Sequence, residues 1–155
     1  MKSFLICVCI VLIVATGACS TSTRRNDTFA FVIEHEVLLR EAVLDIGSAD
    51  WDFEGRPWRS ISLESIENEI LRSALERKEL CKITAVENGI GFCFGGSRQF
   101  EFGFYYSNDG NPIFILDGSR VAFTQDGDRW VYRPQGNTYH TERIVGNFFY
   151  YAMHW

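Results

Sequence analysis

The sequence lacks the local motifs of several large enzyme classes. It contains no glycine-rich phosphate loop, no G-x-S-x-G nucleophile elbow and no S-x-x-K motif. A calcium loop of the D-x-[DN]-x-[DN]-G-x₅-E type is also missing. We therefore expect no cofactor and no metal, and binding is a better expectation than catalysis.

Clustered positive charge is missing as well. The 155 residues carry 15 Lys and Arg against 20 Asp and Glu, which gives a formal net charge of −5. Nucleic-acid-binding proteins gather Lys and Arg on one face to contact phosphates. We therefore expect no nucleic-acid partner.

The chain has no apolar run of the length that spans a bilayer. Its longest run, residues 4–15, has twelve residues, whereas a transmembrane helix needs about 20. Lys2 precedes the run, and the small residues 16–18 follow it. This order is typical of an export signal, so residues 1–18 are predicted to be a signal peptide.

The end of this leader reads Thr16-Gly17-Ala18-Cys19. It resembles the lipobox of bacterial lipoproteins at its last three positions and departs from it at Thr16, where that family usually has an aliphatic residue. The resemblance covers the leader alone and implies that Cys19 is lipidated and becomes the mature N-terminus. The alternative is ordinary cleavage after Ala18, which would give a secreted protein.

Lipidation at Cys19 would place the protein in the cell envelope, outside the cytoplasm and anchored to the membrane. Residues 19–28, rich in Ser and Thr, then read as a polar tether. Residues 29–155 are long enough for one domain with its own core.

Two helices are predicted at the start of that domain. The first runs from Asp27 or Thr28 to Ile46. Its broad apolar stripe contains Phe29, Phe31, Ile33, Val37, Leu38, Ala42 and Leu44. The second runs from a cap at Ser60 or Ser62 to Glu79. Residues 47–61 between them are expected to be irregular.

After residue 82 the apolar period changes from 3.6 to 2, which indicates strands. Strands are predicted at residues 82–87, 90–95, 100–106, 112–116, 120–124, 129–133, 138–144 and 148–153. Asn88-Gly89 predicts a two-residue hairpin that pairs Ile83 with Phe94. The predicted fold is α+β, with two N-terminal amphipathic helices packed on a C-terminal antiparallel β-meander of about six to eight strands.

Two cysteines lie in the predicted first hairpin. Its register directs Cys81 and Cys93 to opposite faces of the sheet, so we expect two separate thiols, with Cys81 buried beside Ile83. A three-residue turn would bring both to one face and would allow a disulfide.

His140 and Glu142 are the candidate catalytic residues. A His-x-Glu pair on a strand puts an imidazole and a carboxylate on one face, and His154 ends the next strand. Such pairs are common on protein surfaces, which is the alternative.

Aromatic side chains, 15% of the chain, are the candidate binding residues. Tyr and Trp on an open sheet face would suit a protein or a carbohydrate partner. The candidates are Trp51, Trp58, Tyr105, Trp130 and Tyr132. Packing of Trp51 and Trp58 under the sheet, and of the tyrosines under a second layer, is the alternative.

Three classes of function remain open from the sequence. The first is an exported, lipid-anchored binding or interaction module. The second is a small extracytoplasmic hydrolase or metal-dependent enzyme that uses His140 and Glu142. The third is a structural lipoprotein of the envelope.

Overall fold

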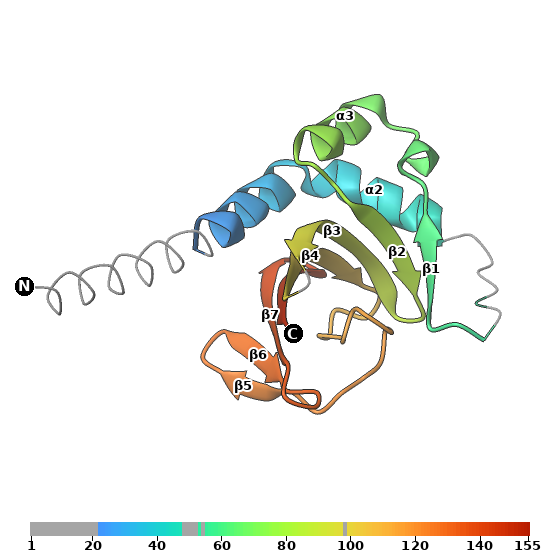
Figure 1. The fold of residues 1–155 in the computed structure, drawn as a ribbon. Helices are drawn as coiled ribbons and strands as arrows, with labels where there is room; N and C mark the ends of the chain where they lie inside the picture. The colour runs from blue at the N-terminus through green and yellow to red at the C-terminus, as the bar shows by residue number, and fades with distance from the viewer. Residues whose placement is uncertain (1–21, 48–52, 54, 98) are drawn as a thin grey trace, which may run out of the picture.

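The computed structural model describes residues 22–47, 53, 55–97 and 99–155. These residues form a layer of helices against one face of an antiparallel sheet (Figure 1). The predicted α+β class with an antiparallel meander is therefore confirmed. The predicted signal peptide and Cys19 lie outside the described residues.

The first helical segment begins earlier than predicted. Residues 22–34 are helical, a turn at His35 interrupts the helix, and α2 continues as Glu36–Gly47. Thr28 lies inside the helix, where its hydroxyl donates to the carbonyl oxygen of Arg24 at 2.8 Å. The part of the predicted tether that is described, from residue 22 onward, is thus helical.

The apolar stripe of this segment also differs from the prediction. The predicted Phe31 and Ala42 are buried, whereas the predicted Ile33, Val37 and Leu44 are exposed. Leu39, Val43 and Ile46, which were not in the predicted stripe, are buried as well. Buried residues at 28, 32, 39, 43 and 46 follow one helical period through both parts of the segment, so the buried stripe is turned around the helix from the predicted one. None of the described helices is long and apolar enough to cross a membrane.

The second predicted helix is shorter and comes after a strand that the sequence did not reveal. Trp58–Ile61 forms β1, Leu63–Ser65 is a 3₁₀ turn, and α3 spans Glu69–Arg77. Asn68 caps α3, with its side-chain oxygen accepting from the Leu71 N–H at 3.0 Å. Ser60 and Ser62 therefore do not start the helix.

Eight strands form one sheet among the described residues, in the order β1-β2-β3-β4-β8-β7-β6-β5. After β1 these are β2 (Lys82–Val86), β3 (Gly89–Ser97), β4 (Phe100–Ser107), β5 (Thr124–Asp126), β6 (Arg129–Tyr132), β7 (Thr138–Val145) and β8 (Phe148–His154). Every pair is antiparallel. Two meanders therefore join where β4 pairs with β8.

The first hairpin turns at Glu87 and Asn88, and not at Asn88-Gly89. Ile83 consequently pairs with Phe92, two residues from the predicted Phe94. Gly89 is needed in the ladder, because a Cβ there would overlap the carbonyl oxygen of Tyr106 on β4. A two-residue shift preserves the face of each side chain, so the predicted apolar face is kept.

Both cysteines are free thiols on opposite faces of β2 and β3. The predicted burial of Cys81 is wrong, because Cys81 is exposed, whereas Cys93 is buried. Cys81 precedes β2 near the edge of the sheet, whereas Cys93 lies in the interior of β3.

The predicted strands at 112–116 and 120–124 are replaced by a long loop between β4 and β5. This loop, residues 108–123, contains a single isolated bridge between Phe114 and Ser119, and only Thr124 of the second prediction is in a strand. Figure 1 shows the loop against the face of the curled sheet that the helices leave open.

Each face of the sheet therefore has its own core. Helical residues such as Val32, Leu39 and Leu71 pack with Phe92 and Phe104 on one side. Ile113 and Ile115 of the loop pack with Tyr139 and its neighbours on the other. Gly91 makes room for this loop, since a Cβ there would lie 2.8 Å from Cγ1 of Ile115.

Candidate functional site

Among the concavities lined by the described residues, two lie on opposite faces of the sheet and are lined by candidate residues from the sequence. The first, which we call the tryptophan groove, is on the loop side and has a volume of about 480 Å³. The second, the helix-side cavity, has a volume of about 310 Å³. Volumes of this order suit small-molecule ligands.

The tryptophan groove crosses the strands from β1 to β8. Trp58 of β1 is 43% exposed and Trp155, which comes after β8, is 50% exposed. Three strands, β2, β3 and β4, separate β1 from β8 in the sheet. The lining is Trp58, Ser60, Lys82, Thr84, Gly91, Cys93, Glu101, Ile115, Leu116, Tyr151 and Trp155.

The polar side chains of the groove form a connected set. Lys82 Nζ lies 3.9 Å from Glu101 Oε1, and the Tyr151 hydroxyl donates to the same carboxylate oxygen at 3.1 Å. Burial raises the pKa of the Cys93 thiol, and the Glu101 charge adds to the effect. This thiol therefore stays protonated at neutral pH and is a poor nucleophile.

One wall of the groove is the loop between β4 and β5, and buried tyrosines hold it in place. The Ile113 N–H donates to the Tyr105 hydroxyl at 3.3 Å, and the Tyr139 hydroxyl donates to the Ile113 carbonyl at 3.1 Å. The N–H and the carbonyl group of Ile113 are thus both hydrogen-bonded to tyrosine side chains of the sheet. Ile115, two residues further on, reaches the groove.

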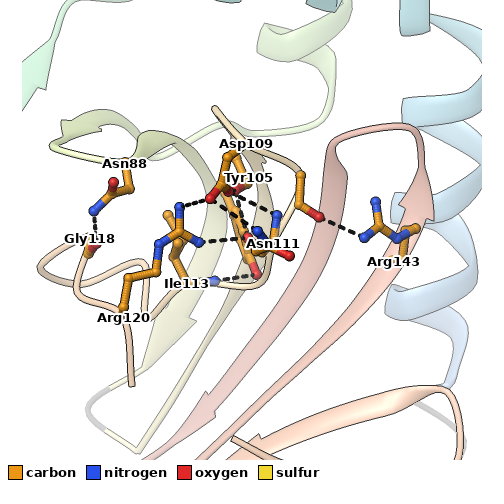
Figure 2. A network of polar contacts seen from close by, with 10 residues as sticks. Asn88, Tyr105, Asp109, Asn111, Ile113, Gly118, Arg120 and Arg143 are labelled. Atoms are coloured by element: carbon orange, nitrogen blue, oxygen red, sulfur yellow. Dashed lines mark hydrogen bonds and ion pairs between the residues drawn. The ribbon is translucent and has the colours of Figure 1, made fainter. Parts of the chain in front are cut away.

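The outer part of this loop is fixed by charged and amide side chains (Figure 2). Arg120 Nη2 lies 2.6 Å from Asp109 Oδ2, and Asn88 Nδ2 donates to the Gly118 carbonyl at 2.8 Å. Arg143 of β7 donates to the Gly110 carbonyl at 2.7 Å. Hydrogen bonds from Asn111 and then from Arg120 lower the pKa of Asp109, so this network is ionised at neutral pH. The wall is therefore formed before any ligand arrives.

The helix-side cavity brings together the histidines and the carboxylate that the sequence singled out. His140 and Glu142 of β7 and His154 of β8 all line it. The rings of His140 and His154 lie 6.3 Å apart at their centroids. The other lining residues are Ser22, Arg25, Arg129, Thr141, Tyr150 and Ala152.

Glu142 is engaged by two guanidinium groups. Arg25, from the first helical segment, donates through Nε to Oε2 at 2.8 Å and also contacts Oε1. Arg129 of β6 lies 3.5 Å from Oε2. This carboxylate is a poor candidate for a general base, because its oxygens already accept charged hydrogen bonds.

Two polar atoms beside the cavity lack a partner in the described part of the chain. The Tyr150 hydroxyl and the His140 Nδ1 are buried and make no hydrogen bond with any of the described residues. An unsatisfied buried group of this kind costs about 1–3 kcal/mol. Burial raises the pKa of Tyr150 to about 12, so its hydroxyl keeps its proton. Burial lowers the pKa of His140, and the charges of His154 and Arg129 lower it further.

The predicted aromatic binding residues separate into three groups. Trp58 lines the groove, whereas Tyr105 is fully buried and serves the loop wall, which corrects its prediction as a binding residue. Trp130 and Tyr132 are half-buried against Phe149 and Phe114. Trp51 lies outside the described residues. Because the sheet is covered on both faces, its central strands leave no open aromatic ladder.

The residues that complete each site were not identified from the sequence. Lys82, Glu101 and Trp155 meet in the groove only because β2, β4 and β8 are brought together by the sheet order. Arg25 was assigned to the tether. Among the described residues, no three His, Cys, Asp or Glu side chains converge as a metal site.

Comparisons of the chain with family models, with curated proteins and with solved structures found no match. A function for the domain must therefore be argued from the geometry of the two concavities.

Proposed function

We propose that this protein is an exported, lipid-anchored binding module that holds a carbohydrate in the tryptophan groove. The export and anchoring part rests on the leader and on the lipobox-like residues that end at Cys19. The binding part rests on the groove. Neither part requires catalytic residues.

The observation that carries the proposal is that two half-exposed tryptophans, Trp58 and Trp155, line one groove together with polar groups. Large aromatics are usually buried, and exposed ones in a concavity mark binding sites. Indole faces offer flat apolar area to the apolar faces of sugar rings. Lys82 and Glu101 supply a donor and an acceptor for hydroxyl groups, as Ser60 and Thr84 also do.

The proposal is tested with a chain that begins at Ser20. All buried residues of the two cores lie between Phe31 and Met153, so this chain keeps them. It is screened on an array of bacterial cell-wall and capsular oligosaccharides, and each hit is measured by isothermal titration calorimetry. We expect saturable binding.

Trp58→Ala and Trp155→Ala should each weaken that binding about tenfold, because one aromatic stacking contact is worth about 0.5–1.5 kcal/mol beyond its buried area. Ile70→Ala is the matched control, since Ile70 is 69% exposed and lies outside the groove. Absence of any oligosaccharide hit would refute the carbohydrate proposal. If both tryptophan variants bind the oligosaccharides as tightly as the unaltered chain does, the groove is not the binding site.

The anchor has its own test. Intact-mass measurement of the mature protein from an expressing bacterium should show acyl chains on Cys19. A mature protein with an unmodified N-terminus would end the lipoprotein proposal and would favour secretion.

A hydrolase is the second candidate, because His140, Glu142 and His154 line one cavity. Since Arg25 and Arg129 occupy Glu142, His140 would have to act as the base. Loss of a measured hydrolytic activity in His140→Gln, with Arg77→Gln unchanged, would support it.

A further inference from the structure

The helix-side cavity has a local charge opposite to that of the whole chain. The protein carries a formal net charge of −5. At the cavity, Arg25 and Arg129 give two positive charges against the one negative charge of Glu142, which leaves 2 − 1 = +1. His140 and His154 also line the cavity.

The donors of the cavity come from four elements, namely the first helical segment and strands β6, β7 and β8. Arg129 enters from β6, and Arg25 enters from the helical segment, where its guanidinium stacks 4.2 Å from the centroid of the Phe29 ring. Tyr150 lies on β8 next to Phe29, with ring centroids 6.1 Å apart. His140 is on β7, which lies between β6 and β8 in the sheet.

Much of this donor capacity is unused. Arg129 uses Nε toward Glu142, and among the described residues its other N–H groups make no hydrogen bond. The Tyr150 hydroxyl and the His140 Nδ1 likewise make none within the described part of the chain. A tetrahedral oxyanion has enough oxygens to accept from several directions, whereas a carboxylate has two oxygens in one plane.

We infer that the helix-side cavity is a phosphate-binding site, in which Arg129, Arg25, Tyr150 and His140 donate to the phosphate oxygens. Glu142 keeps the two guanidinium groups in place beside the phosphate. The site is separate from the tryptophan groove, which lies on the other face of the sheet. Loss of either function would therefore leave the other intact.

The phosphate has two sources that fit the position of the cavity. Ser22 lines the cavity and lies three residues after Cys19, a distance of at most about 11 Å along the chain. If Cys19 is lipidated as proposed, a phospholipid headgroup is within reach. A soluble phosphate compound is the other source.

The test uses the chain that begins at Ser20, labelled with ¹³C and ¹⁵N. Inorganic phosphate is titrated at constant ionic strength while the ring signals of His140 and Tyr150 are followed by NMR. We expect saturable shifts of both rings. Vesicles of phosphatidylcholine with 30% phosphatidylglycerol, compared with phosphatidylcholine alone, are tested by sedimentation.

Arg129→Gln and Tyr150→Phe should each weaken phosphate binding at least tenfold. Arg77→Gln removes an exposed charge outside the cavity, and Tyr106→Phe removes a hydroxyl outside it, so both should bind as the unaltered chain does. Arg129 is largely exposed and Tyr150→Phe removes one atom, so both variants are expected to fold.

The two kinds of measurement distinguish the sources. Saturable phosphate binding without vesicle binding supports the site with a soluble source. Vesicle binding that Arg129→Gln abolishes and Arg77→Gln retains supports a headgroup. Absence of saturable shifts and of vesicle binding would overturn the inference, as would equal losses in Arg129→Gln and Arg77→Gln.

Discussion

Replacement of Tyr105 by Phe tests whether buried tyrosine hydroxyls hold the wall of the tryptophan groove. The Tyr105 side chain is fully buried. Thr141 donates its only hydroxyl proton to the Tyr150 carbonyl at 2.9 Å, so Tyr105 must donate to Thr141, which lies 2.8 Å away. The same hydroxyl accepts from the Ile113 N–H. The substitution removes both bonds and leaves the ring in place.

The expected loss of stability can be worked out from these two bonds. Each net hydrogen bond contributes about 0.5–1.5 kcal/mol, and an unpaired buried N–H costs about 1–3 kcal/mol. Thr141 keeps its bond to Tyr150, whereas the buried Ile113 N–H is left without a partner. We therefore expect the free energy of unfolding to fall by about 2–3 kcal/mol. For a domain of this size the melting temperature should fall by about 6–10 °C.

Two measurements check this. Urea unfolding, followed by fluorescence, gives the change in the free energy of unfolding. Amide hydrogen exchange should be faster at Ile113 and Ile115 of the loop, with strands β3 and β4 less affected. Loosening of the loop should also weaken the binding of any ligand in the groove.

Tyr106→Phe is the control, because this neighbouring tyrosine has no hydrogen-bond partner among the described residues. Its free energy of unfolding should change by less than about 0.5 kcal/mol. A Tyr105→Phe protein as stable as the control would refute the role assigned to the hydroxyl. Unchanged loop exchange would refute the link to the groove.

Two further predictions concern alkaline pH and strand packing. Burial raises the pKa of Tyr105 and Tyr150 to about 12, whereas a tyrosine in the unfolded chain has a pKa of about 10. Between these values the unfolded chain binds fewer protons than the folded protein, so stability should fall as pH rises. Absorbance at 295 nm should show these tyrosines ionising together with unfolding, and ionisation near pH 10 in the folded protein would contradict the assignment. Gly103→Ala should destabilise the protein by about 1–3 kcal/mol in urea, because a Cβ would overlap the Phe92 carbonyl oxygen on β3. Gly47→Ala, which meets no atom within 4 Å, should change stability little, and equal effects of the two substitutions would disprove the close contact.

The strands could be predicted from the sequence where side chains of the two faces alternate over the whole length of a strand. Alternation in residues 100–106 and 148–153 predicted β4 and β8 nearly to their ends. Alternation also predicted strands at 112–116 and 120–124, and there it was wrong. In that loop Ile113 and Ile115 are buried as they would be in a strand, but the polar backbone groups of Ile113 bond to tyrosine side chains.

The helices were less predictable, because more than one stripe of apolar residues in the first helical segment satisfies the helical period. The stripe of Ile33, Val37 and Leu44 satisfied the helical period and is nevertheless exposed. The face of α2 that is buried is the one that packs with residues of the sheet, which are far away in the chain. Trp58 was assigned to an irregular segment because a four-residue strand carries too little alternation to be recognised.

The candidate site, like the fold, could be predicted from the sequence only in part. His140 and Glu142 are two residues apart on one strand, so their common face could be predicted from the period of 2. Their partners could not, since Arg25 and Arg129 reach the cavity from a helix and from another strand. No local pattern indicated that both guanidinium groups would occupy Glu142.

The sequence by itself determined the α+β class, the side of the sheet to which most strand residues point, and the expectation that the chain is exported and lipid-anchored. Composition, local period and turn residues are sufficient for these, because each depends on neighbours along the chain. The tertiary structure alone decided the joining of the two meanders at β4 and β8, the covering of both sheet faces, and the presence of Trp58 and Trp155 in the lining of one groove. These depend on contacts between residues far apart in the chain, which no local pattern encodes.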